Sequence, residues 1–207
     1  MIGVYGGTFD PVHYGHLRTA LEVQEQLDLE AMLMLPAREP PHRDPPQASP
    51  EARRDMLALA LQGQDRLVLD GRELERPGPS YMVDTLESLR AEHGDCPLGL
   101  VLGEDAFGGL DGWDRWERLT ELAHLLVMAR PGGGRPAGAP ARLLTERGVD
   151  DAARLKSRPA GLIYQIEVTS LAISATAIRA QQAAGRSSRY LLPDAVLEYL
   201  QANRLYC

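Results

Sequence analysis

Short apolar runs alternate with longer amphipathic stretches along most of the chain, and this alternation constrains the fold more than any other feature. Runs of the length of a buried strand fall at residues 2–5, 32–35, 67–69, 98–102, 125–128 and 164–168. Stretches with a helical spacing of apolar residues fall at residues 15–27, 51–61, 80–92, 113–122, 176–184 and 193–202. Strands that alternate with helices are typical of βαβ units. The pattern therefore predicts an α/β fold, Rossmann-like and doubly wound, with a mostly parallel sheet and a helical C-terminal segment.

The length and composition fit one such domain spanning residues 1–207. Hydrophobic residues make up 44% of the chain and charged residues 25%, so it can bury a sizeable core and is not disordered as a whole. The net charge of -7 argues against a dedicated nucleic-acid surface, because phosphate backbones are bound by basic patches. We therefore expect no nucleic-acid partner, whereas a small anionic substrate needs only a few local donors.

Cysteine content and hydropathy limit the class of protein further. The two cysteines, Cys96 and Cys207, cannot build a disulfide framework or a four-cysteine zinc site within one chain. No apolar run reaches the roughly 18 residues needed to span a bilayer, and the N-terminal residues show neither a charged region nor a cleavage site. These features predict a cytoplasmic protein without membrane association.

Three stretches are expected to be loops. Residues 36–50, with six prolines, and residues 71–79 directly follow predicted strands. Ligands of doubly wound sheets bind beyond the carboxyl ends of the strands, so these two loops are candidate walls of a substrate site. The third stretch, residues 131–140, is rich in glycine and proline, and it is either functional or a surface insertion.

The strongest local signal is residues 6–16, GGTFDPVHYGH, which follow the first predicted strand and open the first predicted helix. Gly6 and Gly7 permit a tight turn with the backbone close to a ligand. The start of the helix supplies free N–H groups and a partial positive charge for phosphate. The spacing matches neither a Walker loop nor the dinucleotide-binding GxGxxG fingerprint. We expect a phosphate-binding turn of a different kind.

Two histidines in this segment are candidate phosphate ligands. His13 and His16 are three residues apart, so they share one face if the helix begins there, and Gly15 would keep that face open. Imidazoles can donate hydrogen bonds to phosphate and, when protonated, offset developing charge. Surface or helix-capping histidines are one alternative interpretation, and a metal-binding pair is another.

The second signal is residues 173–179, ISATAIR. Ser174 or Thr176 could simply cap the helix that follows. Alternatively, both hydroxyls and Arg179 lie at a second helix start aimed at the same phosphates, where a guanidinium can bind phosphate oxygens bidentately. The residues alone leave both interpretations open.

With both segments present in this order, the chain resembles the nucleotidyltransferases that carry a GTFDPxHxGH start and an ISxTxIR finish. The resemblance is closest to their nicotinate mononucleotide adenylyltransferase branch, and it extends to residues 205–206, nearly the whole chain. Neither motif alone separates this branch from pantetheine-phosphate or cytidylyl relatives. The segments between them do: residues 40–43 (PPHR), 78–81 (GPSY), 84–86 (DTL) and 102–105 (LGED), with Trp113.

This resemblance implies attack of the 5′-phosphate of nicotinate mononucleotide on the α-phosphorus of ATP, forming deamido-NAD and pyrophosphate. Magnesium would accompany ATP, held mainly by phosphate and water. His13, His16 and Arg179 would be catalytic. The implied ATP-binding residues are these three with Gly6, Gly7, Thr8, Phe9, Gly103, Asp105, Ile173, Ser174 and Thr176. The implied binding residues for the second substrate are Thr8, Arg43, Tyr81, Thr85 and Trp113, with the Trp113 ring stacked on the pyridine.

Some alternatives stay open beside the resemblance. Trp113 could be a core residue, and Asp105 could be the N-cap of a short helix. The same chemistry could act on nicotinamide mononucleotide or pantetheine phosphate, or the fold could serve a non-catalytic nucleotide-binding regulator. Three positions depart from the commonest family pattern: Arg43 in place of lysine, Met82 in place of threonine, and Ala175 in place of a second serine.

Overall fold

The computed structural model describes residues 1–41, 44–129 and 136–207. Its centre is a seven-stranded sheet in the order β3-β2-β1-β4-β5-β7-β6, and all neighbouring strands are parallel. The strands are β1 (Ile2–Gly7), β2 (Ala31–Pro36), β3 (Leu67–Leu69), β4 (Leu98–Gly103), β5 (His124–Ala129), β6 (Gly148–Val149) and β7 (Ile163–Glu167). The predicted α/β class is confirmed, and the sheet is parallel throughout.

Side chains of successive strand residues enter two separate apolar clusters, one on each face of the sheet. In β4, Leu98 and Leu100 join one cluster and Val101 joins the other. A strand alternates its side chains between the two faces, so a strand buried on both faces must be apolar at nearly every position. This requirement explains why the strands are continuous apolar runs in the sequence.

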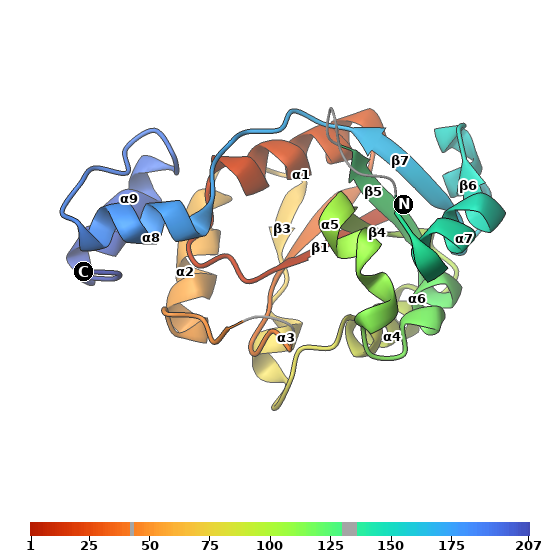
Figure 1. The fold of residues 1–207 in the computed structure, drawn as a ribbon, viewed down its shortest axis with the longest axis horizontal. Coiled ribbons are helices and arrows are strands. Elements are labelled where there is room, and N and C mark those ends of the chain that lie inside the picture. The colour runs from red at the N-terminus through yellow and green to blue at the C-terminus, as the bar shows by residue number, and fades with distance from the viewer. Residues whose placement is uncertain (42–43, 130–135) are drawn as a thin grey trace.

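Helices cover both faces (Figure 1). The helices that contribute to the first cluster are α1 (Tyr14–Gln26), α2 (Pro50–Ala60), α8 (Ala175–Ala183) and α9 (Asp194–Ala202). Those that contribute to the second are α4 (Met82–His93), α5 (Glu104–Gly108) and α6 (Trp116–Leu122). The remaining helices are α3 (Arg72–Glu75) and α7 (Gly138–Arg147), with 3-10 turns η1 (Leu110–Gly112) and η2 (Ala152–Ser157). Figure 1 shows α8, α9 and the C-terminus together at one end of the molecule, and α7 with β6 at the other.

The strand order reverses its direction between β1 and β4. From β1 the chain first builds outward through β2 to β3, and it then returns to place β4 on the other side of β1. Ligands of open α/β sheets bind in the crevice outside the carboxyl ends of the strands at such a reversal. The topology therefore directs attention to the segments that follow β1 and β4.

Several element boundaries differ from the sequence expectations. Residues 72–75 of the expected 71–79 loop form α3, and the helix expected from residue 113 begins at Trp116. Residues 138–140 of the third expected loop open α7, which accepts Pro140 because it lies in the first helical turn. Residues 131–135 of that loop lie outside the described residues. The two-residue strand β6 was not expected, because so short a segment shows no period.

Among the residues described, no helix is both long and apolar enough to cross a membrane.

Candidate active site

The turn that leaves β1 places His13 at the N-cap position of α1. The backbone of His13 is extended, and its carbonyl oxygen accepts hydrogen bonds from the N–H groups of His16 (2.9 Å) and Leu17 (3.2 Å). The His13 side chain makes no capping hydrogen bond. The interpretation of His13 as a side-chain helix cap is therefore wrong, and its imidazole is left for another use.

The imidazoles of His13 and His16 lie face to face. Their ring centroids are 3.8 Å apart with an interplanar angle of 25°, as the i, i+3 spacing suggested. The Phe9 ring meets His16 edge-on at a centroid distance of 5.1 Å. A Cβ on Gly15 would lie 2.9 Å from Cε1 and Nδ1 of His13. Gly15 therefore makes room for the His13 ring itself, which corrects the expectation that it keeps the face open.

Burial sets the protonation state of His13. The residue is 5% exposed, and burial lowers its pKa to about 4. Its imidazole is therefore neutral near pH 7 and has one N–H to donate. Its Nδ1 atom is buried and has no hydrogen-bond partner among the described residues. Buried polar atoms are nearly always paired in folded proteins, so an unpaired one fits a site that a ligand completes.

The structure brings the two motifs together, although about 160 residues separate them in sequence. The carbonyl oxygen of Ile173 lies 3.5 Å from the position of a Cβ on Gly15. Arg179 Nη1 donates a hydrogen bond to the carbonyl oxygen of Asp10 (2.7 Å). The Nε atom of Arg179 is buried without a hydrogen-bond partner in the described part of the chain. The site thus brings the stacked imidazoles of the first motif and the Arg179 guanidinium of the second into one region, with the His13 ring neutral near pH 7.

Ser174 and Thr176 lie at the start of α8. Ser174 is its N-cap, and its Oγ accepts a hydrogen bond from the N–H of Ala177 at 3.2 Å. The capping interpretation of Ser174 is therefore confirmed. Thr176 lies in the first turn, where its Oγ1 accepts from Arg179 Nη2 at 3.4 Å. Both side chains are exposed, so a phosphate at this helix start can still reach them.

Gly6 and Gly7 end β1, and Thr8 and Phe9 follow in the turn. A Cβ on Gly6 would lie 2.6 Å from Met82 Cε, and one on Gly7 would lie 2.8 Å from the Phe9 ring. A side chain on Gly7 would collide with the buried Phe9 ring, whereas one on Gly6 would only have to displace the terminal methyl group of Met82. Phe9 itself is buried, and Thr8 is half-buried. Met82, one of the departures from the family pattern, covers Gly6 from the start of α4.

Gly103 and Asp105 lie at the carboxyl end of β4, next to the β1 turn. Gly103 is the N-cap of α5, and no atom lies within 4 Å of the position of its missing Cβ. Asp105 is exposed in the first turn of α5. The interpretation of Asp105 as the N-cap is therefore wrong, because Gly103 holds that place. Open space above Gly103 leaves room for a ligand beside the backbone.

Tyr81 and Thr85 lie at the start of α4, where Tyr81 is the N-cap. Thr85 is fully buried, and its hydroxyl donates to Glu73 Oε1 at 2.7 Å and accepts from Arg76 Nη2 at 3.1 Å. Burial raises the pKa of Glu73. The Thr85 hydroxyl is thus engaged inside the protein, and the N–H groups at the start of α4 are the donors that remain for an anion.

Trp113 lies between η1 and α6 and is half-buried against the second apolar cluster. The next turn carries Arg115, which forms an ion pair with Asp84 on α4. This ion pair holds the Trp113 segment beside the start of α4. Trp113 is therefore packed against the core without being a wholly buried core tryptophan. Arg43, expected to contact phosphate, lies outside the described residues.

Three polar residues beneath the site had no role in the sequence expectations: Asp10, Arg53 and Tyr206. Arg53 is fully buried and donates hydrogen bonds to the carbonyl oxygens of Thr8 (2.9 Å), Ala37 (2.5 Å), Arg38 (3.0 Å) and Ala48 (3.3 Å). It ties the β1 turn to the proline-rich loop. Nothing local marks an arginine on an amphipathic helix for burial, so no sequence signal could have found it.

Within the residues described, no group of three or more histidine, cysteine, aspartate or glutamate side chains is close enough to bind a metal ion. A metal site on His13 and His16 would thus lack a third protein ligand from that part of the chain. This geometry gives the metal-pair interpretation no support.

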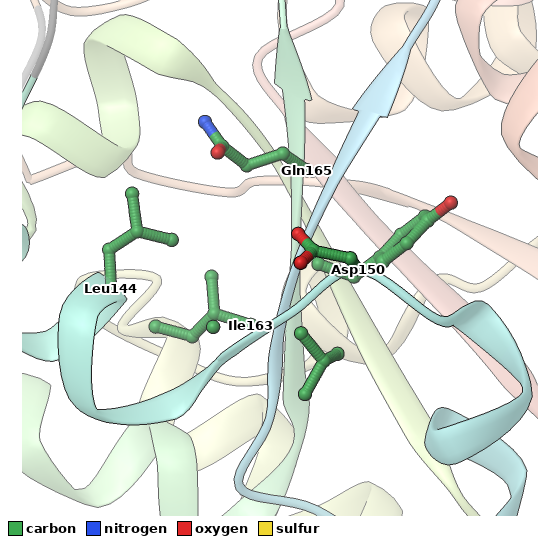
Figure 2. Close-up of a pocket in the computed structure, with 7 residues that line it drawn as sticks. Leu144, Asp150, Ile163 and Gln165 are labelled. Atoms are coloured by element: carbon green, nitrogen blue, oxygen red, sulfur yellow. The ribbon is translucent and has the colours of Figure 1, made fainter.

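A separate hollow of about 330 Å³ lies at the outer edge of the sheet. Figure 2 shows Leu144 on α7 and Ile163 and Gln165 on β7 around it, with Asp150 after β6. None of the described residues that line it belongs to either motif. We therefore place the candidate active site at the carboxyl ends of β1 and β4.

Comparisons with known proteins identify the family of the chain. A model of the cytidylyltransferase-like family matches residues 4–181. A protein of Methylococcus capsulatus described as "probable nicotinate-nucleotide adenylyltransferase" is 53% identical over 208 residues, covering 100% of this chain and 99% of the relative. One of the same description from Pseudomonas putida is 54% identical, covering 99% of this chain and 94% of the relative.

A solved structure shows the same fold at low sequence identity. Plasmodium falciparum nicotinic acid mononucleotide adenylyltransferase, complexed with NaAD, matches with a TM-score of 0.72 and 18% identity. The match covers 99% of this chain and 96% of that one.

Proposed function

The chain belongs to the cytidylyltransferase-like family, and on that premise we propose that it transfers the adenylyl group of ATP to nicotinate mononucleotide. The products are deamido-NAD and pyrophosphate, and the reaction is a step of NAD biosynthesis. The proposal takes residues 1–207 as one nucleotidyltransferase domain, because one apolar cluster includes both Met1 and Leu200.

The observation that carries the proposal is the meeting of the two motifs at the reversal of strand order. His13, His16 and Arg179 lie together there, and buried nitrogens of His13 and Arg179 lack partners among the described residues. Hydrogen-bond donors and a fixed cation in a protected turn match a polyanion, and the start of α8 adds a second set of donors.

The reaction forms a bond between a 5′-phosphate oxygen of nicotinate mononucleotide and the α-phosphorus of ATP. The bond from that phosphorus to the oxygen bridging to the β-phosphorus breaks, and pyrophosphate leaves with the electron pair. No protein nucleophile is required. The protein's task is to hold two anions in line and to stabilise the charge that develops as the bond breaks.

Each site group has a role in that task. His13, neutral near pH 7, donates one hydrogen bond to phosphate, and its stacking on His16 orients both rings. Arg179 contributes a permanent positive charge that stabilises the leaving pyrophosphate. Thr176 and the N–H groups at the start of α8 lie beside it as further donors. Gly103 and Asp105 would border the adenosine.

The acceptor would bind between the start of α4 and Trp113. N–H groups at the helix start favour the anionic carboxylate of nicotinate, and a half-buried indole offers a flat surface to the pyridine ring. ATP would enter as its magnesium complex, with the ion held by the triphosphate and water.

The decisive experiment supplies the purified protein with ATP and magnesium and follows pyrophosphate release with three acceptors in parallel. We expect fast release with nicotinate mononucleotide and at most slow release with nicotinamide mononucleotide and pantetheine phosphate. Equal rates with both pyridine mononucleotides would contradict the carboxylate pocket. Release with none of the three acceptors would contradict the proposed function.

The His16→Ala variant tests the proposed site. Removal of a donor to developing charge typically costs about 100-fold or more in kcat. His93→Ala is the control, because His93 lies at the far end of α4 beside Glu92. We expect a large loss for the first variant, no loss for the second, and an unchanged circular dichroism spectrum for both. Wild-type turnover in His16→Ala would remove His16 from the mechanism.

A further inference from the structure

The C-terminal residues reach the phosphate site. Tyr206, the penultimate residue, is half-buried, and its hydroxyl donates a hydrogen bond to Asp10 Oδ1 at 2.6 Å. Its backbone has φ +63°, a left-handed conformation that residues other than glycine rarely adopt. Such a conformation persists where surrounding contacts hold it. The tail is therefore docked on the β1 turn.

Asp10 is the centre of a buried polar cluster. It is 4% exposed, and its carboxylate also accepts hydrogen bonds from the N–H groups of Gln47 (2.8 Å) and Ala48 (3.1 Å). A buried carboxylate is stable only when its oxygens are paired. The Tyr206 hydroxyl supplies one of the three hydrogen bonds that the described residues donate to it.

Asp10 in turn holds Arg179. Arg179 Nη1 donates to the carbonyl oxygen of Asp10 at 2.7 Å and lies 3.7 Å from its Oδ2. These contacts fix one side of the guanidinium, while its buried Nε keeps no partner among the described residues. A guanidinium that is held in place while its Nε–H still lacks a partner is preorganised for a phosphate.

We propose that Tyr206 is a positioning residue for ATP, which orients the Asp10 carboxylate and through it the Arg179 guanidinium that binds the triphosphate. The inference rests on the proposed function in that ATP is the ligand of Arg179. It makes the last residues of the chain part of the nucleotide site, although they follow the second motif by more than 25 residues.

The test removes only the hydroxyl, in Tyr206→Phe. Calorimetry without an acceptor measures the Kd for magnesium-ATP, so the result does not depend on which acceptor is used. We expect about a tenfold rise in Kd, slightly less than the loss of a hydrogen bond to a charged group costs when it is felt in full. The KM for ATP should rise similarly, while the KM for nicotinate mononucleotide changes less than twofold.

Tyr199→Phe is the matched control. Tyr199 lies on α9, and its hydroxyl donates to Asp55 on α2 at 3.3 Å, a contact with a carboxylate that does not hold Arg179. A general loosening of the C-terminal segment would raise the Kd in both variants. We expect the control to bind ATP as the wild type does, and equal effects in the two variants would overturn the proposal.

A double-mutant cycle separates positioning from structural support. In an Arg179→Ala background, Tyr206→Phe should change the Kd for ATP less than twofold, because its target is gone. An undiminished tenfold effect in that background would overturn the proposal. A chain truncated after Leu205 serves as a second variant with the same expectations. If both variants unfold, Tyr206 has a purely structural role and the proposal fails.

If wild-type protein binds ATP but releases no pyrophosphate with any acceptor, the proposed function fails while the role of Tyr206 is still decided by the binding data.

Discussion

Gly15→Ala should separate catalysis from stability. The new Cβ would lie 2.9 Å from Cε1 and Nδ1 of His13, whereas ordinary contacts begin near 3.4 Å. The imidazole must therefore withdraw by about half an ångström, and because it is stacked on His16, both rings are affected. A displacement of about 1 Å in a catalytic group can cost about 100-fold in rate, so half of that predicts a loss of about tenfold.

The same substitution should leave the protein folded. Alanine is preferred over glycine in a helix by up to about 1 kcal/mol, and at the second residue of α1 part of this preference offsets the strain near His13. We expect kcat for pyrophosphate release to fall about tenfold, while the free energy of unfolding in urea changes by less than about 1 kcal/mol. Gly71→Ala is the control, because no atom lies within 4 Å of its missing Cβ. Wild-type kcat in Gly15→Ala would refute the steric account of this glycine.

Three further outcomes are expected. Arg53→Met leaves four carbonyl oxygens without their donor and should lower the free energy of unfolding in urea by about 3 kcal/mol; a loss below about 1 kcal/mol would contradict this account. The pKa of His13 is about 4 in the folded protein, whereas an ordinary histidine, as in the unfolded chain, has a pKa of 6.5. Between pH 4 and pH 6.5 the unfolded chain therefore binds more protons than the folded protein does. The contribution of His13 to the free energy of unfolding is therefore fully present above pH 6.5. It decreases as the pH falls toward 4, and the loss is about 2 kcal/mol at pH 5. Urea unfolding should show a smaller loss in His13→Asn, and an equal loss would exclude His13 as its source. Trp113→Ala should raise the KM for nicotinate mononucleotide about tenfold with little change for ATP, and equal changes for both substrates would argue against stacking on the pyridine.

The sequence predicted the class of fold and the six longer strands because these signals are local. A strand buried on both faces must be apolar throughout, and an amphipathic helix repeats its apolar residues every three to four positions. It also predicted a turn between the first strand and the first helix, since paired glycines before a helix start are a local pattern, and phosphate binding at this turn stays a prediction. Boundaries were less well predicted, as at residues 113–115 and 72–75, because turns and tertiary contacts set them.

The sequence by itself thus determined which residues are the candidates for phosphate binding: His13, His16 and Arg179 occur in two recognisable segments. Only the tertiary structure decided how they are held. The Thr85 hydroxyl turns to Glu73, Arg53 ties the turn to the proline-rich loop, and Tyr206 reaches Asp10 from the other end of the chain. Such contacts join residues from 12 to 196 positions apart, and no periodicity or local motif records them. They arise because a buried polar group must find a partner wherever the fold brings one within hydrogen-bond distance.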